Sequence, residues 1–235
     1  MRVEIWSDIS CPWCYVGKAR FAQGLAAFAH AGEVEVVHRS YELDPHRPHG
    51  DSALMVDVLA REFGHTLDQA HAFQDRVSAS ARAEGLEYRT DVATHGNTFD
   101  IHRLLHHAKA WGRQDALLTL VYRADFAEER SVFDPEVLVA LALEAGLDEG
   151  EVRGVLADPA AHAEDVRADE RQAAEVGVRG VPFFVIDRRY GTSGAQHADT
   201  FTHTLEQAWA SRPLTSFGAT EAATCGPDGT CSSPS

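Results

Sequence analysis

Two cysteines stand at the junction between a predicted strand and a predicted helix. Cys11-Pro12-Trp13-Cys14 follows the alternating polar and apolar stretch of residues 2–6 and precedes a helical pattern. Proline at the first helical position loses no hydrogen bond, so Cys11 is the expected N-cap of a helix that begins at Pro12. We expect the Cys11 sulfur to accept hydrogen bonds from first-turn amides, which together with the helix dipole favour its thiolate. Cys11 would then attack, and Cys14, one turn along and screened by its own helix, would resolve.

Metal binding and inert packing are the alternatives for this pair. A zinc site with four cysteine ligands needs a second pair, and the remaining cysteines, Cys225 and Cys231, lie more than two hundred residues further along the chain. The strand-to-helix context therefore favours a redox-active pair, and we expect no metal site.

The charge balance excludes some partners. The formal net charge is −15, from 36 acidic and 21 basic residues, and no basic stripe interrupts it, which disfavours nucleic acid. The first residues do not resemble a signal peptide, and no stretch approaches the roughly eighteen apolar residues of a membrane span. We expect a cytoplasmic protein without nucleic-acid or membrane partners, in which a cysteine pair is catalytic or sensing rather than a permanent crosslink.

The first forty residues predict a strand, a helix and a second strand. Residues 2–6 form the first strand, Phe21 and Leu25 mark the apolar face of the helix, and Gly32 is its expected end. Residues 33–41 are the second strand. This βαβ order brings the cysteines to a helix N-terminus and is typical of the first half of a thioredoxin-like fold.

A long helical region follows the turn-rich residues 44–50. The predicted helix starts are Thr66 with Gln69, Asn97 with Asp100, Asp134 before Pro135, and Asp148 with Glu151. Residues of about 52–157 therefore predict a helical insertion.

Beyond the insertion the pattern returns to a mixed helix and strand order. We expect a helix at 159–176, a buried apolar strand at 181–186, a returning strand at 190–192 and a closing helix that ends before Pro213.

The predicted organisation has three parts. Residues 1–50 and 158–212 form one domain, residues 51–157 are inserted into it, and residues 213–235 form a flexible tail that contains Cys225 and Cys231.

These motifs together resemble the DsbA family of thiol-disulfide oxidoreductases, and most closely its cytoplasmic FrnE-like branch. The matching segments are Ser7-Asp8-Ile9-Ser10, the CPWC motif, Tyr15-Val16-Gly17-Lys18, Asn97-Thr98, His102-Arg103-Leu104, Gly180-Val181-Pro182 and Gly194-Ala195-Gln196. The resemblance covers roughly residues 1–210. It implies an α/β protein with a thioredoxin-like fold, a large all-helical insertion and oxidoreductase activity on protein thiols and disulfides.

Pro182 gains its importance from this resemblance. From the sequence alone it is a trans proline at the first residue of a strand. The family's proline at this point is cis, which would present the Val181 backbone beside the Cys11 sulfur, where an extended substrate chain can pair with it. The resemblance thus implies a substrate-binding surface made of Pro12, Trp13, Val181 and Pro182.

Trp13 replaces the histidine of the periplasmic relatives. An indole offers one donor and bulk where a histidine can supply charge, so we expect a less oxidising disulfide here. The alternative for Trp13 is an aromatic side chain that only covers the cysteine pair.

A second function remains open at this point. The related 2-hydroxychromene-2-carboxylate isomerases and kappa-class transferases use glutathione and share the insertion, but they generally have serine in place of Cys11 and no resolving thiol. The Cys11/Cys14 pair favours exchange with protein thiols and disulfides. We expect no tightly bound cofactor, and glutathione or a thioredoxin-type reductant as redox partner; the oligomeric state stays undetermined.

Other polar residues have simpler interpretations. Asp8, three residues before Cys11, is expected to be a solvated turn residue rather than a proton acceptor for Cys14, and Lys18 is expected to face solvent. His102 and His106 have the spacing of metal ligands, but Arg103 stands where a catalytic glutamate would be, so satisfied or exposed histidines are expected.

Cys225 and Cys231 enclose a turn-prone loop whose ends can meet. Some FrnE-like proteins have a second cysteine pair in the tail, and our hypothesis is that this pair relays oxidising equivalents to or from Cys11 and Cys14.

Overall fold

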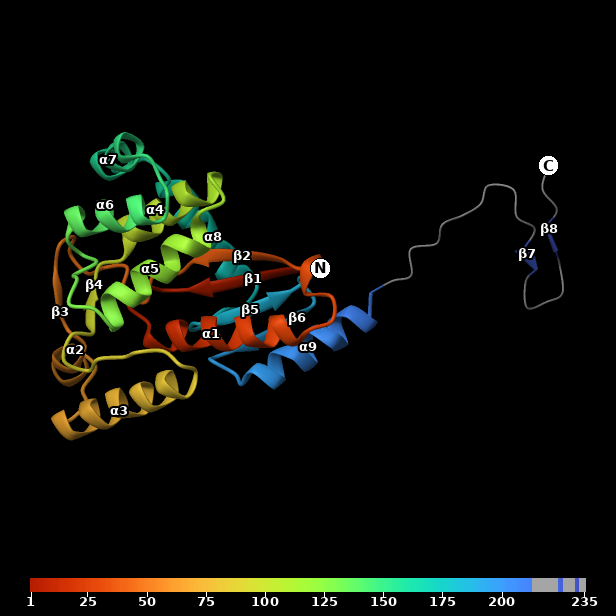
Figure 1. Ribbon diagram of the computed structural model, residues 1–235, viewed down its shortest axis with the longest axis horizontal. Coiled ribbons are helices and arrows are strands. Elements are labelled where there is room, and N and C mark those ends of the chain that lie inside the picture. The colour runs from red at the N-terminus through yellow and green to blue at the C-terminus, as the bar shows by residue number, and fades with distance from the viewer. Residues whose placement is uncertain (213–223, 226–230, 233–235) are drawn as a thin grey trace.

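A four-stranded sheet forms the centre of the molecule (Figure 1). The computed structural model describes residues 1–212, 224–225 and 231–232. The strands are β1 (Arg2–Ser7), β2 (Glu35–Ser40), β5 (Phe183–Ile186) and β6 (Tyr190–Ser193), in the order β2-β1-β5-β6. β1 and β2 are parallel, and the other neighbours are antiparallel. The predicted thioredoxin-like βαβ unit and the C-terminal hairpin are therefore confirmed.

Helices cover both faces of this sheet. α1 (Pro12–Ala27) and α9 (Ala198–Ala210) pack on the face that presents Val3 and Ile5, whereas α8 (Ala163–Glu175) packs on the opposite face beside Trp6. The alternation of side chains along β1 explains this division, because successive residues point to opposite faces of a strand. Gly24 permits the close crossing of α1 and α9, since a Cβ atom there would lie 2.6 Å from the Ala198 carbonyl oxygen.

The end of α1 differs from the prediction. The helix stops at Ala27 with Phe28 as its extended C-cap, and a short 3₁₀ helix, Ala31–Glu33, follows. Gly32 therefore does not end α1. Burial of Phe28 in the core beneath α1 and α9 draws the chain out of the helix before Gly32 is reached.

The insertion contains most of the remaining helices. Its elements are β3 (Ser52–Leu54), α2 (Met55–Arg61), α3 (Leu67–Ala83), β4 (Thr94–Gly96), α4 (Phe99–Ala110), α5 (Gln114–Phe126), α6 (Pro135–Glu144) and α7 (Glu149–Ala157). The predicted caps at Thr66, Asp134 and Asp148 are confirmed, each accepting a backbone N–H with its side chain.

From residue 51 onward the structure differs from the prediction in three details. β3 and β4 pair antiparallel, so the insertion is not all helical. α4 begins one position later than predicted, with Thr98 as N-cap, while Asn97 accepts the Phe99 N–H. The helix predicted from residue 159 begins only at Ala163, because the Asp158 side chain holds a turn at Ala160.

Arg103 joins α4 to the segment between α7 and α8. It is 1% exposed, pairs with Asp100, and donates to the carbonyl groups of Val155, Asp158 and Ala161. One guanidinium therefore ties three backbone carbonyls of the α7–α8 connection to α4.

A continuous apolar cluster connects the insertion with the cysteine motif. Cys11, Cys14, Tyr15 and Val16 belong to the same cluster as the buried residues of α4–α7. The insertion gathers at the end of the sheet where β1 leads into α1, and the N-terminus and the end of α9 lie at the opposite end (Figure 1). The insertion therefore encloses the first turn of α1.

The predicted tail lies mostly outside the described residues. Within it, β7 (Thr224–Cys225) and β8 (Cys231–Ser232) pair antiparallel in a register that sets Cys225 opposite Cys231. The flexibility predicted for residues 213–235 stays a prediction, because residues 213–223, 226–230 and 233–235 lie outside the described residues. No helix in the described ranges has both the length and the apolar composition needed to cross a membrane.

Candidate active site

Cys11 occupies the predicted position at the start of α1. It is the N-cap in an extended conformation, and Pro12 is the first helical residue. The side chain makes no capping hydrogen bond, contrary to the prediction. The Cys11 thiol instead donates to the Val181 carbonyl, with 3.6 Å between sulfur and oxygen. The Cys11 sulfur thus points at the loop before β5, 170 residues along the chain.

Cys14 lies deeper than Cys11. Its exposed fraction is 1%, against 5% for Cys11, and both are free thiols. Burial raises the pKa of the Cys14 thiol well above its ordinary value, and its contact with Cys11 raises it further. Cys14 is therefore a protonated, shielded thiol beside the outer sulfur.

The loop before β5 faces Cys11 across a narrow gap. The Val181–Pro182 peptide bond is cis, as the family resemblance implies and contrary to the trans bond expected from the sequence alone. Val181 is partly exposed, and Pro182 is buried against α1. The absence of a side chain at Gly17 permits this contact, because a Cβ atom there would lie 2.9 Å from the Pro182 Cγ atom.

Replacing Gly17 with alanine should therefore impair the site. The added methyl group must displace the Pro182 ring, which moves the Val181 carbonyl away from Cys11. We expect a stability loss of about 1–3 kcal/mol and an exchange rate about tenfold lower. Urea unfolding and an insulin-reduction assay measure the two effects.

Gly154→Ala is the matched control for this substitution. Gly154 is exposed on α7 and has no atom within 4 Å of an added Cβ, so alanine should be neutral or stabilising there. Gly17→Ala protein with unchanged stability and rate would contradict the proposed contact.

Trp13 and α3 form one wall beside the cysteines. Trp13 is partly exposed and meets Phe73 edge to face, with ring centroids 6.5 Å apart. The Arg76 guanidinium lies 6.0 Å from the Phe73 ring centroid. Trp13, Phe73 and the partly exposed Val181 are apolar groups that pack against the cluster containing Cys11.

Asp8 is buried, contrary to the prediction of a solvated turn residue. Its carboxylate accepts hydrogen bonds from the Ile9 and Leu43 N–H groups at 2.7 and 2.8 Å and lies 3.2 Å from His102 Nε2. Burial alone would raise the Asp8 pKa, but the hydrogen bond and charge of His102 and the Leu43 N–H outweigh it, so the pKa is lowered.

The Asp8 backbone also supports the cysteine loop. Its carbonyl accepts the Cys11 N–H at 3.3 Å and the Tyr122 hydroxyl at 3.1 Å. Asp8 therefore links β1, the first turn of α1 and helices α4 and α5 of the insertion, and it fixes the position of Cys11 without contacting the sulfur.

A second buried polar cluster lies in the insertion near Cys11. The Asp125 carboxyl accepts a hydrogen bond from the Thr94 hydroxyl, and the Tyr88 hydroxyl donates to Gln74. Asp125 Oδ2 and Gln74 Nε2 are buried without a hydrogen-bond partner among the described residues. Burial, partly offset by Thr94, raises the pKa of Asp125 to about 7, and the negative charge of Asp8 contributes.

Asp125→Asn should therefore change how stability depends on pH. The unfolded chain releases this proton near pH 4 and the folded protein only near pH 7, so ionisation favours unfolding across that interval. The wild-type free energy of unfolding should lose about 4 kcal/mol from this group between pH 4 and 7, and the variant should lack that loss. Urea unfolding at pH 4, 6 and 8 tests this, and parallel curves for the two proteins would contradict it.

The remaining sequence-predicted residues lie away from the sulfur atoms. Lys18 is half-buried rather than solvent-facing and pairs with Asp115 at 2.8 Å. His106 Nε2 lies 3.1 Å from the Ser40 hydroxyl and 3.2 Å from Asp169, and His102 contacts Asp8, so both histidines have protein partners. Within the described residues, no group of three or more His, Cys, Asp or Glu side chains has metal-site geometry.

Comparison with known proteins gives consistent similarities. A sequence profile of the DSBA-like thioredoxin domain matches residues 2–206. A probable DsbA oxidoreductase from Streptomyces coelicolor is 58% identical, covers 100% of both chains and superposes with a TM-score of 0.89.

More distant structures share only the fold. The cytosolic disulfide reductase DsbM from Pseudomonas aeruginosa, also solved with GSH, is 18% identical with a TM-score of 0.64, covering 89% of this chain and 99% of that one. A 2-hydroxychromene-2-carboxylate isomerase is 17% identical with a TM-score of 0.65, covering 89% and 95%. The fold alone therefore does not distinguish the two chemistries.

Proposed function

Because the chain belongs to the family of DSBA-like thioredoxin domains, a family of thiol oxidoreductases, we propose that it exchanges disulfides with protein substrates through Cys11 and Cys14. The observation on which the proposal rests is the pair itself. Cys11 precedes the first turn of α1, and Cys14 beside it is buried with a raised pKa. In this proposal Cys11 attacks, and Cys14 stays protonated until the attack has occurred.

The exchange proceeds in two balanced steps. The Cys11 thiolate attacks one sulfur of a substrate disulfide, a bond forms between them, and the other substrate sulfur leaves as a thiolate. Cys14 then gives its proton to solvent and attacks the Cys11 sulfur. The bond between Cys11 and the substrate breaks, a Cys11–Cys14 disulfide forms, and the second substrate sulfur leaves as a thiolate. Two electrons have passed from the pair to the substrate, and the reverse sequence oxidises a substrate dithiol. Glutathione or a thioredoxin-type protein would restore the starting state.

Substrate binding in this proposal uses backbone more than side chains. The Val181 carbonyl lies beside the Cys11 thiol, and an extended chain that pairs with the Val181 backbone would bring its own sulfur to Cys11. Trp13 and Phe73 would contact apolar side chains of that substrate. We therefore expect many substrate sequences to be accepted.

The alternative is a glutathione-dependent isomerase, which the structural similarity to 2-hydroxychromene-2-carboxylate isomerase brings into consideration. Such a reaction does not require a second thiol next to the first. Cys14 and its burial beside Cys11 favour disulfide exchange.

An insulin-reduction assay tests the proposal. Wild-type protein with a thiol reductant should accelerate insulin reduction, and Cys11→Ser should abolish the acceleration. Equilibration of the pair against glutathione buffers then determines the direction of exchange, because it fixes the reduction potential. If Cys11→Ser retains the wild-type rate, or if only 2-hydroxychromene-2-carboxylate is converted, the proposal fails.

The tail pair remains a separate part of the proposal. The register of β7 and β8 sets Cys225 opposite Cys231, which supports a second redox pair. Truncation after Arg212 should then slow turnover with at least one reductant or substrate, and unchanged turnover with all of them would remove the relay.

A further inference from the structure

β2 is an edge strand, and its outer edge presents backbone groups in a definite order. In a parallel pair, each residue directs both its N–H and its C=O to the same side, and successive residues alternate. The Glu35 N–H donates to the Met1 carbonyl at 2.8 Å, so Glu35 belongs to the inward set. Val36, His38 and Ser40 therefore direct their backbone groups away from β1.

Side chains satisfy only one end of this outer edge. The Ser40 N–H donates to Asp169 at 2.9 Å, and the His38 carbonyl accepts the Gln114 side-chain amide at 3.3 Å. The Gln114 amide occupies the place of a peptide N–H from a neighbouring strand. Among the described residues, the Val36 N–H, the Val36 carbonyl and the His38 N–H have no partner. An unpaired strand edge of this kind binds extended chains.

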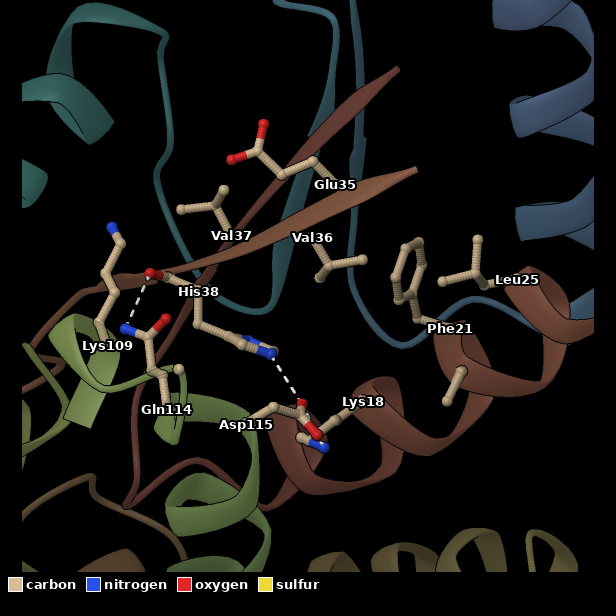
Figure 2. Close-up of a pocket in the computed structure, with 12 residues that line it drawn as sticks. Lys18, Phe21, Leu25, Glu35, Val36, Val37, His38, Lys109, Gln114 and Asp115 are labelled. Carbon is tan, nitrogen blue, oxygen red and sulfur yellow. Dashed lines mark hydrogen bonds and ion pairs between the residues drawn. The ribbon is translucent and has the colours of Figure 1, made fainter. Parts of the chain in front are cut away.

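A groove of about 610 Å³ lies along the same edge, between β2, α1 and the start of α5 (Figure 2). Phe21, Leu25 and Val36 form its apolar end, and Lys109 and Gln114 stand at the His38 end (Figure 2). The volume is that of a ligand site and accommodates two or three side chains of an added strand.

The groove is lined by two positive and two negative side chains, Lys18 and Lys109 with Glu35 and Asp115. The sequence contains two lysines, Lys18 and Lys109, and both line the groove. Lys18 pairs with Asp115, which also lies 3.0 Å from His38 Nε2. Glu35 lies 3.9 Å from Arg2, whereas Lys109 has no ion pair or hydrogen bond with the described part of the chain. A carboxylate in the occupant would supply the missing partner.

We propose that an extended segment of a partner protein binds to β2 as an additional strand, with an apolar side chain against Phe21 and Leu25 and an acidic side chain at Lys109. A second copy of this chain is a poorer occupant, because each copy has a net charge of −15. A short segment with one acidic residue is repelled much less by the negative charge of this protein.

The proposed site is separate from the cysteines. The residues of α1 that line it, Lys18 to Leu25, follow Cys11 by 7 to 14 positions, which is roughly 10 to 20 Å along the helix axis. The proposal therefore stands apart from disulfide exchange, and a partner can stay bound at β2 while Cys11 reacts.

Fluorescence anisotropy with labelled peptides tests the site on the full chain. The probes are ten-residue peptides of alternating Val and Thr in which Glu replaces each position in turn. At least one should bind with a Kd below about 1 mM, and Lys109→Glu should weaken it at least tenfold. Arg61→Glu, on the exposed face of α2, is the control for the change in charge and should leave binding unchanged.

Two further changes test the strand geometry. Val36→Pro removes the free N–H without breaking a bond to β1, and it should weaken binding at least fivefold. N-methylation of one alternate set of peptide residues should abolish binding, and methylation of the other set should not. Equal effects of both sets, no binding by any probe, or a dimer of the protein that Lys109→Glu dissociates would each overturn the proposal.

Discussion

Cys14→Ser protein should accumulate as a mixed disulfide with its substrate. Cys14 lies beside Cys11 and is 1% exposed, so in the wild type the second attack is intramolecular. Well-oriented intramolecular groups reach effective concentrations of about 10⁵ M or more, whereas an external thiol acts at roughly millimolar concentration. We expect turnover in insulin reduction to fall at least about 1000-fold. The hydroxyl of serine cannot replace the thiolate as a nucleophile toward sulfur at neutral pH.

The trapped species provides the direct measurement. Mass spectrometry of the reaction mixture should show the variant joined to one insulin chain, and dithiothreitol should release it. Cys11→Ser is the control and should form no adduct, because Cys14 is shielded by α1 and by Tyr122. A Cys14→Ser enzyme that turns over at the wild-type rate would contradict the two-cysteine mechanism and favour the isomerase reaction.

The sequence predicts the start of α1 and several helix caps because their determinants are local. The position of Pro12 at the start of α1 and the order of strands 2–6 and 33–41 follow from neighbouring residues. The same holds for the caps at Thr66, Asp134 and Asp148, where each cap accepts an N–H two or three residues away.

α5 was not anticipated because its signals are weak. Its N-cap, Arg113, makes no side-chain cap hydrogen bond, so the start signal present at Thr66, Asp134 and Asp148 is missing. The buried positions are Leu117, Leu118, Val121, Tyr122, Ala124, Asp125 and Phe126. These positions lie on one broad face at helical spacing, so the missing signal is the cap and not the apolar pattern.

Contacts between distant residues account for the other omissions. Gly17 matters through Pro182, 165 positions away, and the local sequence gives no sign of the contact. Asp8 has the local sequence of an exposed turn, but its partners Leu43 and His102 come from other parts of the chain. The position of Asp8 three residues before a cysteine does not reveal its burial. Only the packing of α4 against this loop shows its role.

Asp8→Asn should lower both stability and activity. The asparagine side chain keeps one oxygen, which can still accept the Ile9 N–H. Its NH₂ group then faces the Leu43 N–H, and His102 loses its carboxylate partner. Removing one member of a buried charged pair costs about 3–5 kcal/mol. The loop that positions Cys11 should also loosen, and the insulin-reduction rate should fall about tenfold or more.

The pH dependence distinguishes this role from a general loss of packing. The Asp8 pKa in the folded protein lies below its ordinary value of 3.8, so its contribution to stability is present above about pH 4 and is lost as the pH falls through the folded value. The wild-type free energy of unfolding should therefore fall more steeply below about pH 4 than that of Asp8→Asn. Asp75→Asn, on the exposed side of α3, is the control and should leave stability and rate within about 0.5 kcal/mol and twofold of wild type. If the free energies of unfolding of Asp8→Asn and wild type fall in parallel below about pH 4, the carboxylate is not ionised in the native state. The contact from α4 through Asp8 to Cys11 would then be uncharged.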